Sequence, residues 1–219
     1  MALILVGSVL GVGFLLFVAV VSLVTGARAR ALTSAGAAAV WVALYAVLLV
    51  GTSLASHEEV LSPGDTKYFC GFFLDCHIGV AVVGHDEPAT IAGLRTSGSY
   101  HVLTLRFSSS ARRATLSPYV VRMSLRGDDG RSYGRSRSAE DDLARARSHL
   151  REGAGALERR IEPGGSYTVD VVFELPSGVR PTRLLVSEGE GVDRLLDGLV
   201  IGIEPSFLHG RTWLALPAA

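Results

Sequence analysis

"SYTVDVVFEL", residues 166–175, is the segment of this chain that determines the fold class. Every second residue of the segment is large and apolar, namely Tyr167, Val169, Val171, Phe173 and Leu175. The intervening positions are mostly polar, with Val172 as the exception. A period of two with one apolar face is typical of a half-buried β-strand. We therefore expect a strand whose apolar face lies against a core.

The same periodicity recurs upstream and downstream of this segment. Further candidate strands are "HIGVAVV" (77–83), "YHVLTLRF" (100–107), "PYVVRMSLRG" (118–127), "PTRLLVSE" (181–188) and "RTWLAL" (211–216). Because 77–83 is almost uniformly apolar, we expect it to be a central strand. Turn-forming sequences separate the strands, at "GDDG" (127–130), "EPGG" (162–165) and "LPSG" (175–178).

One segment departs from the strand pattern, and we expect a short helix or a loop insertion near 138–153. It begins with Ser138 and acidic residues and continues with Leu143, Ala146 and Leu150 at helical spacing. Many short strands with one brief helix favour an antiparallel β-sandwich over residues 57–219, large enough to bury one core. A lipocalin-like barrel is the all-β alternative, although the insertion disfavours its regular hairpins.

The first 56 residues have a different composition. Residues 1–27 and 31–56 carry no charged side chain, and each stretch exceeds the roughly 20 apolar residues that cross a bilayer. We expect a hairpin of two transmembrane helices over residues 1–56. A cleaved signal peptide is the alternative for the first stretch, and a buried core helix is the alternative for the second.

Arginines between the two apolar stretches predict the orientation of the hairpin. Arg28 and Arg30 would each cost about 2.5–3.5 kcal/mol at the centre of a membrane helix, and basic loops favour the cytoplasm. Acidic residues, Glu58 and Glu59, follow the second stretch. The sequence thus predicts a cell-membrane protein with two spans and an extracytoplasmic domain at residues 57–219.

The overall charge gives no indication of nucleic-acid binding. The chain has 21 acidic and 21 basic residues, and all of them except Arg28 and Arg30 lie from Glu58 onward. The expected outer domain is therefore close to neutral, without the basic patch that binds nucleic acid.

Two turn motifs resemble a known family. The first is "MSLRGDDGRSYG", with Asp128 or Asp129 followed by Gly130 and Tyr133; the second is "IEPGGSYTVDVVFELPSG", with Pro163, Gly164, Ser166, Val172, Phe173, Glu174 and Pro176. Together they resemble bacterial membrane-anchored immunoglobulin-like domains of unknown function, named by analogy with a telomeric-repeat-binding-factor-like immunoglobulin fold. The resemblance covers roughly residues 97–190. It implies an immunoglobulin-like sandwich and supplies no catalytic residues.

The cysteines Cys70 and Cys76 lie together in "YFCGFFLDCHIGVAVVGH", residues 68–85, and are the only two in the chain. We expect a structural disulfide between them, because an extracytoplasmic location is oxidising. An extended strand would hold their Cα atoms about 20 Å apart, so the chain must turn between them. A redox pair, unpaired thiols, and a metal site formed by Cys70, Cys76, His77 and His85 are the alternatives.

The remaining residues suggest no catalytic site. His101 falls on the apolar face of its expected strand, which favours a core histidine over a general base. We expect no enzyme activity and no cofactor, but a membrane-anchored module that contacts the bilayer and binds a protein or another envelope component. A metal-binding or thiol-redox accessory protein is the competing hypothesis. Gly7 and Gly11 have the spacing that lets membrane helices approach closely. A third hypothesis is therefore that the protein is a subunit of a larger membrane complex.

Overall fold

The computed structural model describes residues 2–69, 76–146, 157, 159–189, 191–204 and 206–219. The helices of this part of the chain are α1 (Ala2–Val24), α2 (Arg28–Ala55), α3 (Arg137–Ala146) and α4 (Val192–Leu199). The strands are β1 (Glu59–Leu61), β2 (Lys67–Phe69), β3 (Ile78–Asp86), β4 (Ser99–Ser109), β5 (Arg122–Gly127), β6 (Ser132–Gly134), β7 (Ser166–Leu175), β8 (Pro181–Ser187) and β9 (Thr212–Ala215). They form two compact units, one built on α1, α2 and residues 192–210, the other on the strands and α3.

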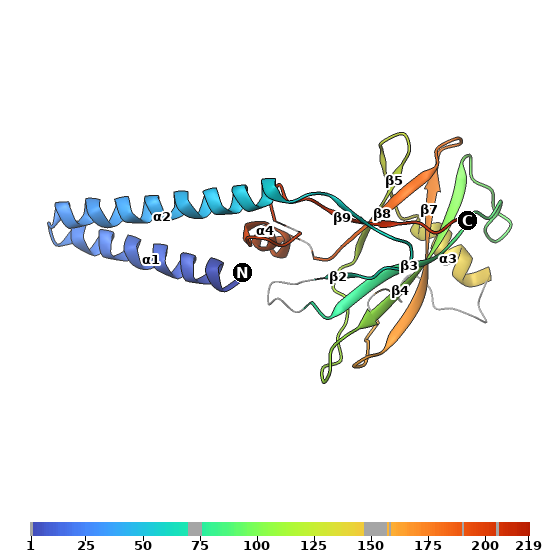
Figure 1. Ribbon diagram of the computed structural model, residues 1–219, viewed down its shortest axis with the longest axis horizontal. Coiled ribbons are helices and arrows are strands. Elements are labelled where there is room, and N and C mark those ends of the chain that lie inside the picture. The colour runs from blue at the N-terminus through green and yellow to red at the C-terminus, as the bar shows by residue number, and fades with distance from the viewer. Residues whose placement is uncertain (1, 70–75, 147–156, 158, 190, 205) are drawn as a thin grey trace. The chain divides into compact units, whose positions relative to one another are not determined.

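Helices α1 and α2 lie side by side as a hairpin (Figure 1). Gly26 ends α1 in the left-handed region at φ 77°, a conformation that glycine adopts without steric cost. Both helices are long and apolar enough to cross a membrane. Their side chains are mostly exposed; Phe14 is 66% exposed and Val47 68%. This exposure contradicts the alternative in which α2 is the buried core helix of a soluble domain.

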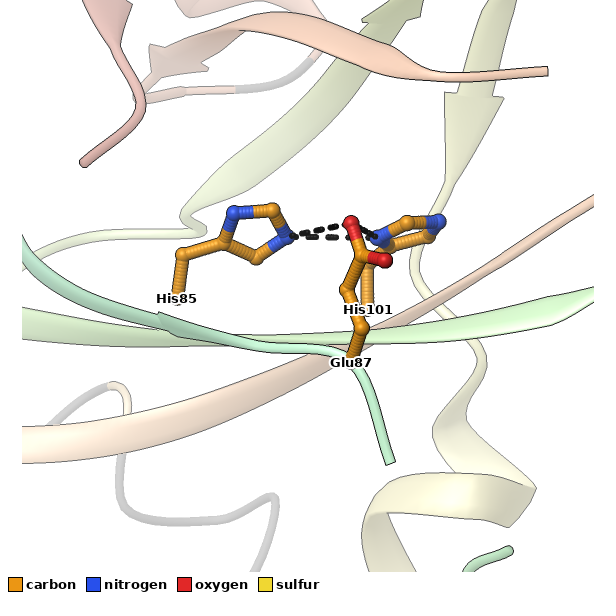
Figure 2. A group of neighbouring side chains, drawn as sticks. All are labelled: His85, Glu87 and His101. Carbon is orange, nitrogen blue, oxygen red and sulfur yellow. Dashed lines mark hydrogen bonds and ion pairs between the residues drawn. The ribbon is translucent and has the colours of Figure 1, made fainter. Parts of the chain in front are cut away.

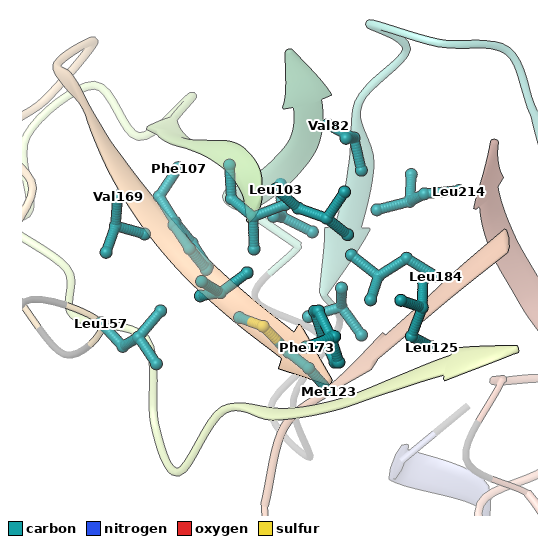
Figure 3. Packing of buried hydrophobic residues seen from close by; sticks show 14 of the residues in the cluster. Val82, Leu103, Phe107, Met123, Leu125, Leu157, Val169, Phe173, Leu184 and Leu214 are labelled. Carbon is teal, nitrogen blue, oxygen red and sulfur yellow. The ribbon is translucent and has the colours of Figure 1, made fainter. Parts of the chain in front are cut away.

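The strands form two packed sheets, as the alternation in the sequence predicts. One sheet has the order β1-β9-β8-β5-β6 and the other the order β2-β3-β4-β7. The strand at 166–175 is confirmed as β7, and its Val169, Val171, Phe173 and Leu175 are all buried in the core between the sheets. Figure 3 shows Phe173 and Leu184 within this core. The segment 77–83 is confirmed as an interior strand, because β3 lies between β2 and β4.

One strand pair departs from the expected antiparallel arrangement. Strands β1 and β9 pair in parallel, with Val60 opposite Trp213. Both strands begin where the chain enters the second unit, after residues 57 and 210. The two entering segments run in the same direction, and the backbone N–H of Glu59 donates to the carbonyl of Arg211 at 3.1 Å. Because each segment continues directly into its strand, the two strands run parallel.

Val172, the exception to the alternation, is buried on the opposite face of its sheet. It is 0% exposed and packs in a second apolar cluster with Tyr100, Val102 and residues of α3. A buried carboxylate holds α3 in place: Glu140 accepts hydrogen bonds from the Val172 N–H at 3.1 Å and from the Arg135 Nε at 2.8 Å. The sequence predicted a helix or a loop in this region, and α3 covers residues 137–146 of it.

Two further expectations require correction. Strand β5 begins at Arg122 rather than at residue 118, and Tyr119 is 57% exposed instead of facing the core. Val120 has a φ of 45°, which is incompatible with an extended strand and explains why the strand starts later. The sequence analysis also missed α4, because it predicted no helix over residues 192–199.

The turn motifs have defined structural roles. The Tyr133 hydroxyl donates to Asp129 at 2.6 Å, and the same carboxylate accepts the N–H of Arg131 at 2.9 Å. Gly130 adopts a φ of 77° between them. Asp129, rather than Asp128, is therefore the partner of the tyrosine in this β5–β6 hairpin.

Candidate metal-binding site

Two neighbouring strands and the loop after β3 bring together His85, His101 and Glu87. His85 lies near the end of β3, His101 lies near the start of β4, and Glu87 follows β3 directly. The antiparallel register places Asp86 opposite Val102, so Glu87 and His101 are at neighbouring ends of the two strands. Pairing of the strands therefore brings His101 beside His85 and Glu87, which precede it in the chain by 16 and 14 residues.

A β-bulge in β3 gives His85 its inward orientation. Val82 pairs with Leu105 and Gly84 with Thr104, so the register shifts by one residue between them. Val82 is buried in the core and Val83 is 39% exposed. Without the extra residue, strict alternation would place His85 on the outer face of the sheet. With it, His85 is buried beside His101.

The three side chains present one ligand atom each to a common point. The Nε2 of His85 lies 3.2 Å from the Nδ1 of His101. The Oε1 of Glu87 lies 3.3 Å from the same Nδ1 and 3.7 Å from the Nε2 of His85. Figure 2 shows the carboxylate reaching toward the gap between the two imidazole rings. These atoms form a nearly equilateral triangle.

Burial differs between the imidazoles and the carboxylate. His85 is 8% exposed and His101 is 2% exposed, whereas the side chain of Glu87 is 49% exposed. The triangle is therefore enclosed on the imidazole side and open to solvent on the carboxylate side. An ion held there would have two fixed nitrogen ligands, one adjustable oxygen ligand and room for water.

Each imidazole has a second polar partner on its other nitrogen. The Nδ1 of His85 lies 3.4 Å from the carbonyl oxygen of Pro217, and the Nε2 of His101 lies 2.9 Å from the Ser99 hydroxyl. A carbonyl only accepts, so a proton on the His85 Nδ1 leaves its Nε2 with a lone pair directed at the triangle. The Ser99 hydroxyl either donates or accepts, and when it accepts, the Nδ1 of His101 also offers a lone pair. Partners of this kind orient the histidine ligands of metal sites.

The environment favours the neutral, ligating form of His101. Burial lowers the pKa of His101 most strongly; Glu87 raises it, and His85 lowers it further. Because a metal ligand must be unprotonated, this net downward shift keeps His101 available at neutral pH.

The residues singled out in the sequence do not all come together here. Cys70 lies outside the described residues, so the disulfide with Cys76 stays a prediction. His77 is exposed just before β3 and contacts Ser110, with its Nδ1 3.1 Å from the hydroxyl. His85 lies at the other end of β3, about 26 Å away at 3.3 Å per residue. Among the alternative metal ligands that the structure describes, namely Cys76, His77 and His85, it places only His85 in this cluster.

His101 and Glu87 were missed as members of a site. His101 is buried, in agreement with its interpretation as a core histidine, but its partners are another histidine and a carboxylate. The only signal would have been the register of β3 with β4, which places Asp86 opposite Val102 and so residue 87 next to residue 101. The sequence does not reveal the bulge, and regular alternation along β3 would place His85 on the opposite face of the sheet from His101.

The chain is thus a β-sandwich preceded by two apolar helices of membrane-spanning length.

No family model matches the sequence, and no curated protein is similar to it. Solved structures similar to the fold include MPT63, a secreted protein from Mycobacterium tuberculosis, at 17% identity and a TM-score of 0.41, covering 63% of this chain and 93% of MPT63. An uncharacterized β-sandwich protein from Clostridium difficile is 8% identical with a TM-score of 0.39, covering 74% of this chain and 96% of its own. A conserved hypothetical protein from Bacillus anthracis is 9% identical with a TM-score of 0.39, covering 57% of this chain and 87% of its own.

Proposed function

We propose that this protein is a membrane-anchored, extracytoplasmic module whose β-sandwich binds a divalent transition-metal ion through His85, Glu87 and His101. The observation that carries the proposal is the size of the ligand triangle. Bonds of about 2.0–2.2 Å to a tetrahedral Zn²⁺ place two ligand atoms about 3.3–3.6 Å apart. The three separations of 3.2, 3.3 and 3.7 Å lie within about 0.1 Å of that range.

The ligand types narrow the choice of ion. Two imidazoles and a carboxylate suit Zn²⁺, Cu²⁺ or another late first-row ion, whereas Ca²⁺ and Mg²⁺ prefer oxygen ligands alone. With three protein ligands, a fourth position would be filled by water or by a group on a partner. The proposed role is binding, and no turnover is proposed.

A metal titration of the full-length protein in detergent tests the site. After chelator treatment without reducing agent, Co²⁺ reports its ligands through its visible absorption, and Zn²⁺ competition gives the affinity. Removal of a residue that hydrogen-bonds to a metal ligand typically weakens metal binding by about 10–100-fold. Glu87→Gln removes a proposed ligand itself, so it should weaken metal binding by more than that. Glu87 is exposed, so the substitution leaves the core intact.

The matched control is Asp86→Asn, which removes a neighbouring exposed carboxylate on the same strand. It should leave the affinity unchanged. Strong near-ultraviolet charge transfer from thiolate to Co²⁺, lost in Cys76→Ser, would instead favour the cysteine-based site. Equal effects of the two carboxylate substitutions would contradict the proposal.

The membrane anchoring is proposed from α1 and α2. Helix α2 has 28 residues, which corresponds to about 42 Å at 1.5 Å per residue and exceeds the roughly 30 Å hydrocarbon core. Arg28 and Arg30 favour a cytoplasmic turn, so residues on either side of the hairpin would lie outside the cytoplasm. A reporter fused after Ala219 that is active only in the cytoplasm would contradict this topology. Amino-terminal sequencing that begins after residue 27 would instead identify a cleaved signal peptide.

The sandwich is further proposed to be an immunoglobulin-like domain of the family that its turn motifs resemble. The Tyr133–Asp129 hydrogen bond across the left-handed Gly130 supports this assignment, because it gives the motif a structural reason to recur. An envelope protein is the proposed macromolecular partner. A set of homologues in which Asp129 and Tyr133 vary independently would contradict the family assignment.

A further inference from the structure

Residues 192–204 and 206–208 combine a short helix with an irregular segment that packs against the ends of α1 and α2. Val200 and Ile203 are buried in an apolar cluster with Leu5 of α1, and Tyr45 of α2 packs against the same cluster. The Tyr45 hydroxyl donates to the carbonyl of Leu199 at 2.6 Å. The whole segment belongs to the same compact unit as the two helices.

Besides Arg194, the outward side of this segment carries mainly large apolar side chains. Its exposed large side chains are Val192 (68%), Leu195 (56%), Leu196 (38%), Phe207 (46%) and Leu208 (68%). Soluble proteins rarely expose so many neighbouring apolar side chains without a function for them.

The depth of Tyr45 identifies what covers this surface. Tyr45 follows Arg28 by 17 residues, or about 26 Å at 1.5 Å per residue. With Arg28 at the inner boundary of a hydrocarbon core of about 30 Å, Tyr45 lies just below the outer boundary, where tyrosine is enriched in membrane proteins. Its partner Leu199 lies at the same depth, which places the exposed apolar side chains of this segment near the outer boundary of the hydrocarbon core.

The backbone of the irregular part is suited to a site with little water. Three backbone N–H groups donate to backbone carbonyls within the segment: Val200 to Asp197 at 3.0 Å, Phe207 to Gly198 at 3.0 Å and Ser206 to Ile203 at 2.9 Å. The Ser206 hydroxyl accepts from the Ile203 N–H at 3.2 Å and donates to the Val200 carbonyl. Where water is scarce, the N–H and C=O groups of a non-helical backbone must form hydrogen bonds within the protein, as these groups do.

We infer that residues 192–204 and 206–208 form an interfacial membrane element, with Val192, Leu195, Leu196, Phe207 and Leu208 inserted into the acyl-chain boundary of the outer leaflet. This inference rests on the membrane anchoring proposed above. It adds a third contact with the bilayer, contributed from the far end of the sequence. The return of the chain to the membrane follows the sandwich strand β8 and precedes β9.

Quenching of tryptophan fluorescence by brominated acyl chains tests the inference in the full-length protein reconstituted in phosphatidylcholine vesicles. Three single-tryptophan proteins are compared: native Trp41 alone, and Phe207→Trp or Tyr119→Trp in a background where Trp41 and Trp213 are phenylalanine. Trp41 is 48% exposed on α2 and reports the spanning helices, and Tyr119 is 57% exposed on the sandwich. Phe207→Trp should lose emission to an extent comparable with Trp41, and Tyr119→Trp should lose none.

The outcomes separate the two proposals. Quenching of Trp41 without quenching at position 207 would overturn the interfacial element and leave the anchoring intact. A lack of quenching at Trp41 would overturn the anchoring itself. Leu196→Trp in the same background is the second probe, because it replaces a different exposed side chain of α4; it must be quenched together with position 207 for the inference to stand.

Discussion

The buried ion pair beneath α3 leads to a prediction that runs against intuition: removing one partner should cost more stability than altering both. The Glu140 side chain is 2% exposed and that of Arg135 is 12% exposed. Glu140 accepts from the Arg135 Nε at 2.8 Å and from its Nη2 at 2.5 Å. Arg135→Met keeps most of the side-chain volume and leaves a buried carboxylate with the Val172 N–H as its remaining donor among these contacts.

The magnitude follows from the cost of an uncompensated buried charge. Breaking a buried pair by removing one partner typically costs about 3–5 kcal/mol. Adding Glu140→Gln neutralises the carboxylate while its amide oxygen still accepts from Val172. The double variant should therefore cost only about 1–3 kcal/mol, the range for an unsatisfied neutral group.

Urea unfolding of the full-length protein in detergent, followed by Trp213 emission in a Trp41→Phe background, measures the difference. Trp213 is 4% exposed in β9 and so reports the sandwich. With urea m-values of about 1–3 kcal/mol per molar, Arg135→Met should lower the midpoint by at least about 1 M. Arg145→Met is the matched control, because Arg145 pairs with Asp142 on the exposed side of the same helix and such pairs contribute about 0–1 kcal/mol. A double variant no more stable than Arg135→Met would refute the reasoning.

Three further expectations concern the sandwich. Burial lowers the pKa of His101, so on acidification the imidazole is protonated in the unfolded chain before it is protonated in the folded protein. The free energy of unfolding is therefore at its full value above the unfolded pKa of about 6.5 and decreases as the pH falls below it. His101→Gln should weaken this pH dependence, measured as urea midpoints across pH with chelator present. Phe173→Ala should cost about 3–5 kcal/mol, because Phe173 is 0% exposed in the central core, and a midpoint near that of the parent would show that the core refills the space. Lys67→Met should cost about 1–3 kcal/mol, because the buried Nζ donates to the carbonyls of Val186 at 2.8 Å and Thr212 at 2.9 Å; thermal unfolding at or above the parent temperature would contradict it.

Much of the architecture follows from local pattern. Alternation in 166–175 predicts a strand because a strand with one face on a core must place apolar side chains at every second position, and the uniformly apolar run 77–83 predicts a strand that is covered on both sides. Residues 1–56 predict two long apolar helices because uncharged stretches of that length are rare in soluble helices. Val172 broke the alternation for a reason that no local pattern contains: α3, from a distant part of the chain, covers the outer face of its sheet.

Only part of the candidate site could be predicted from the sequence. The sequence drew attention to His85 through its proximity to the cysteines, and placed His101 correctly in the core. Glu87 carried no signal of its own, since an exposed acidic residue after a strand is common. The bulge between Val82 and Gly84 reversed the expected face of His85, and the register of β3 with β4 determined that His101 is its partner.

The sequence by itself therefore determined the periodicity of the strands, the two apolar helices and the turns, because each depends on residues close together along the chain. The tertiary structure alone decided which side chains meet. Residues 85, 87 and 101 form a triangle because a single inserted residue and a strand register bring them together. Residues 192–204 and 206–208 join the apolar helices because Tyr45 and Leu5 offer a hydrogen bond and an apolar surface to a segment about 150–200 residues away. Such contacts depend on the free energy of the whole fold, which no local stretch of sequence contains.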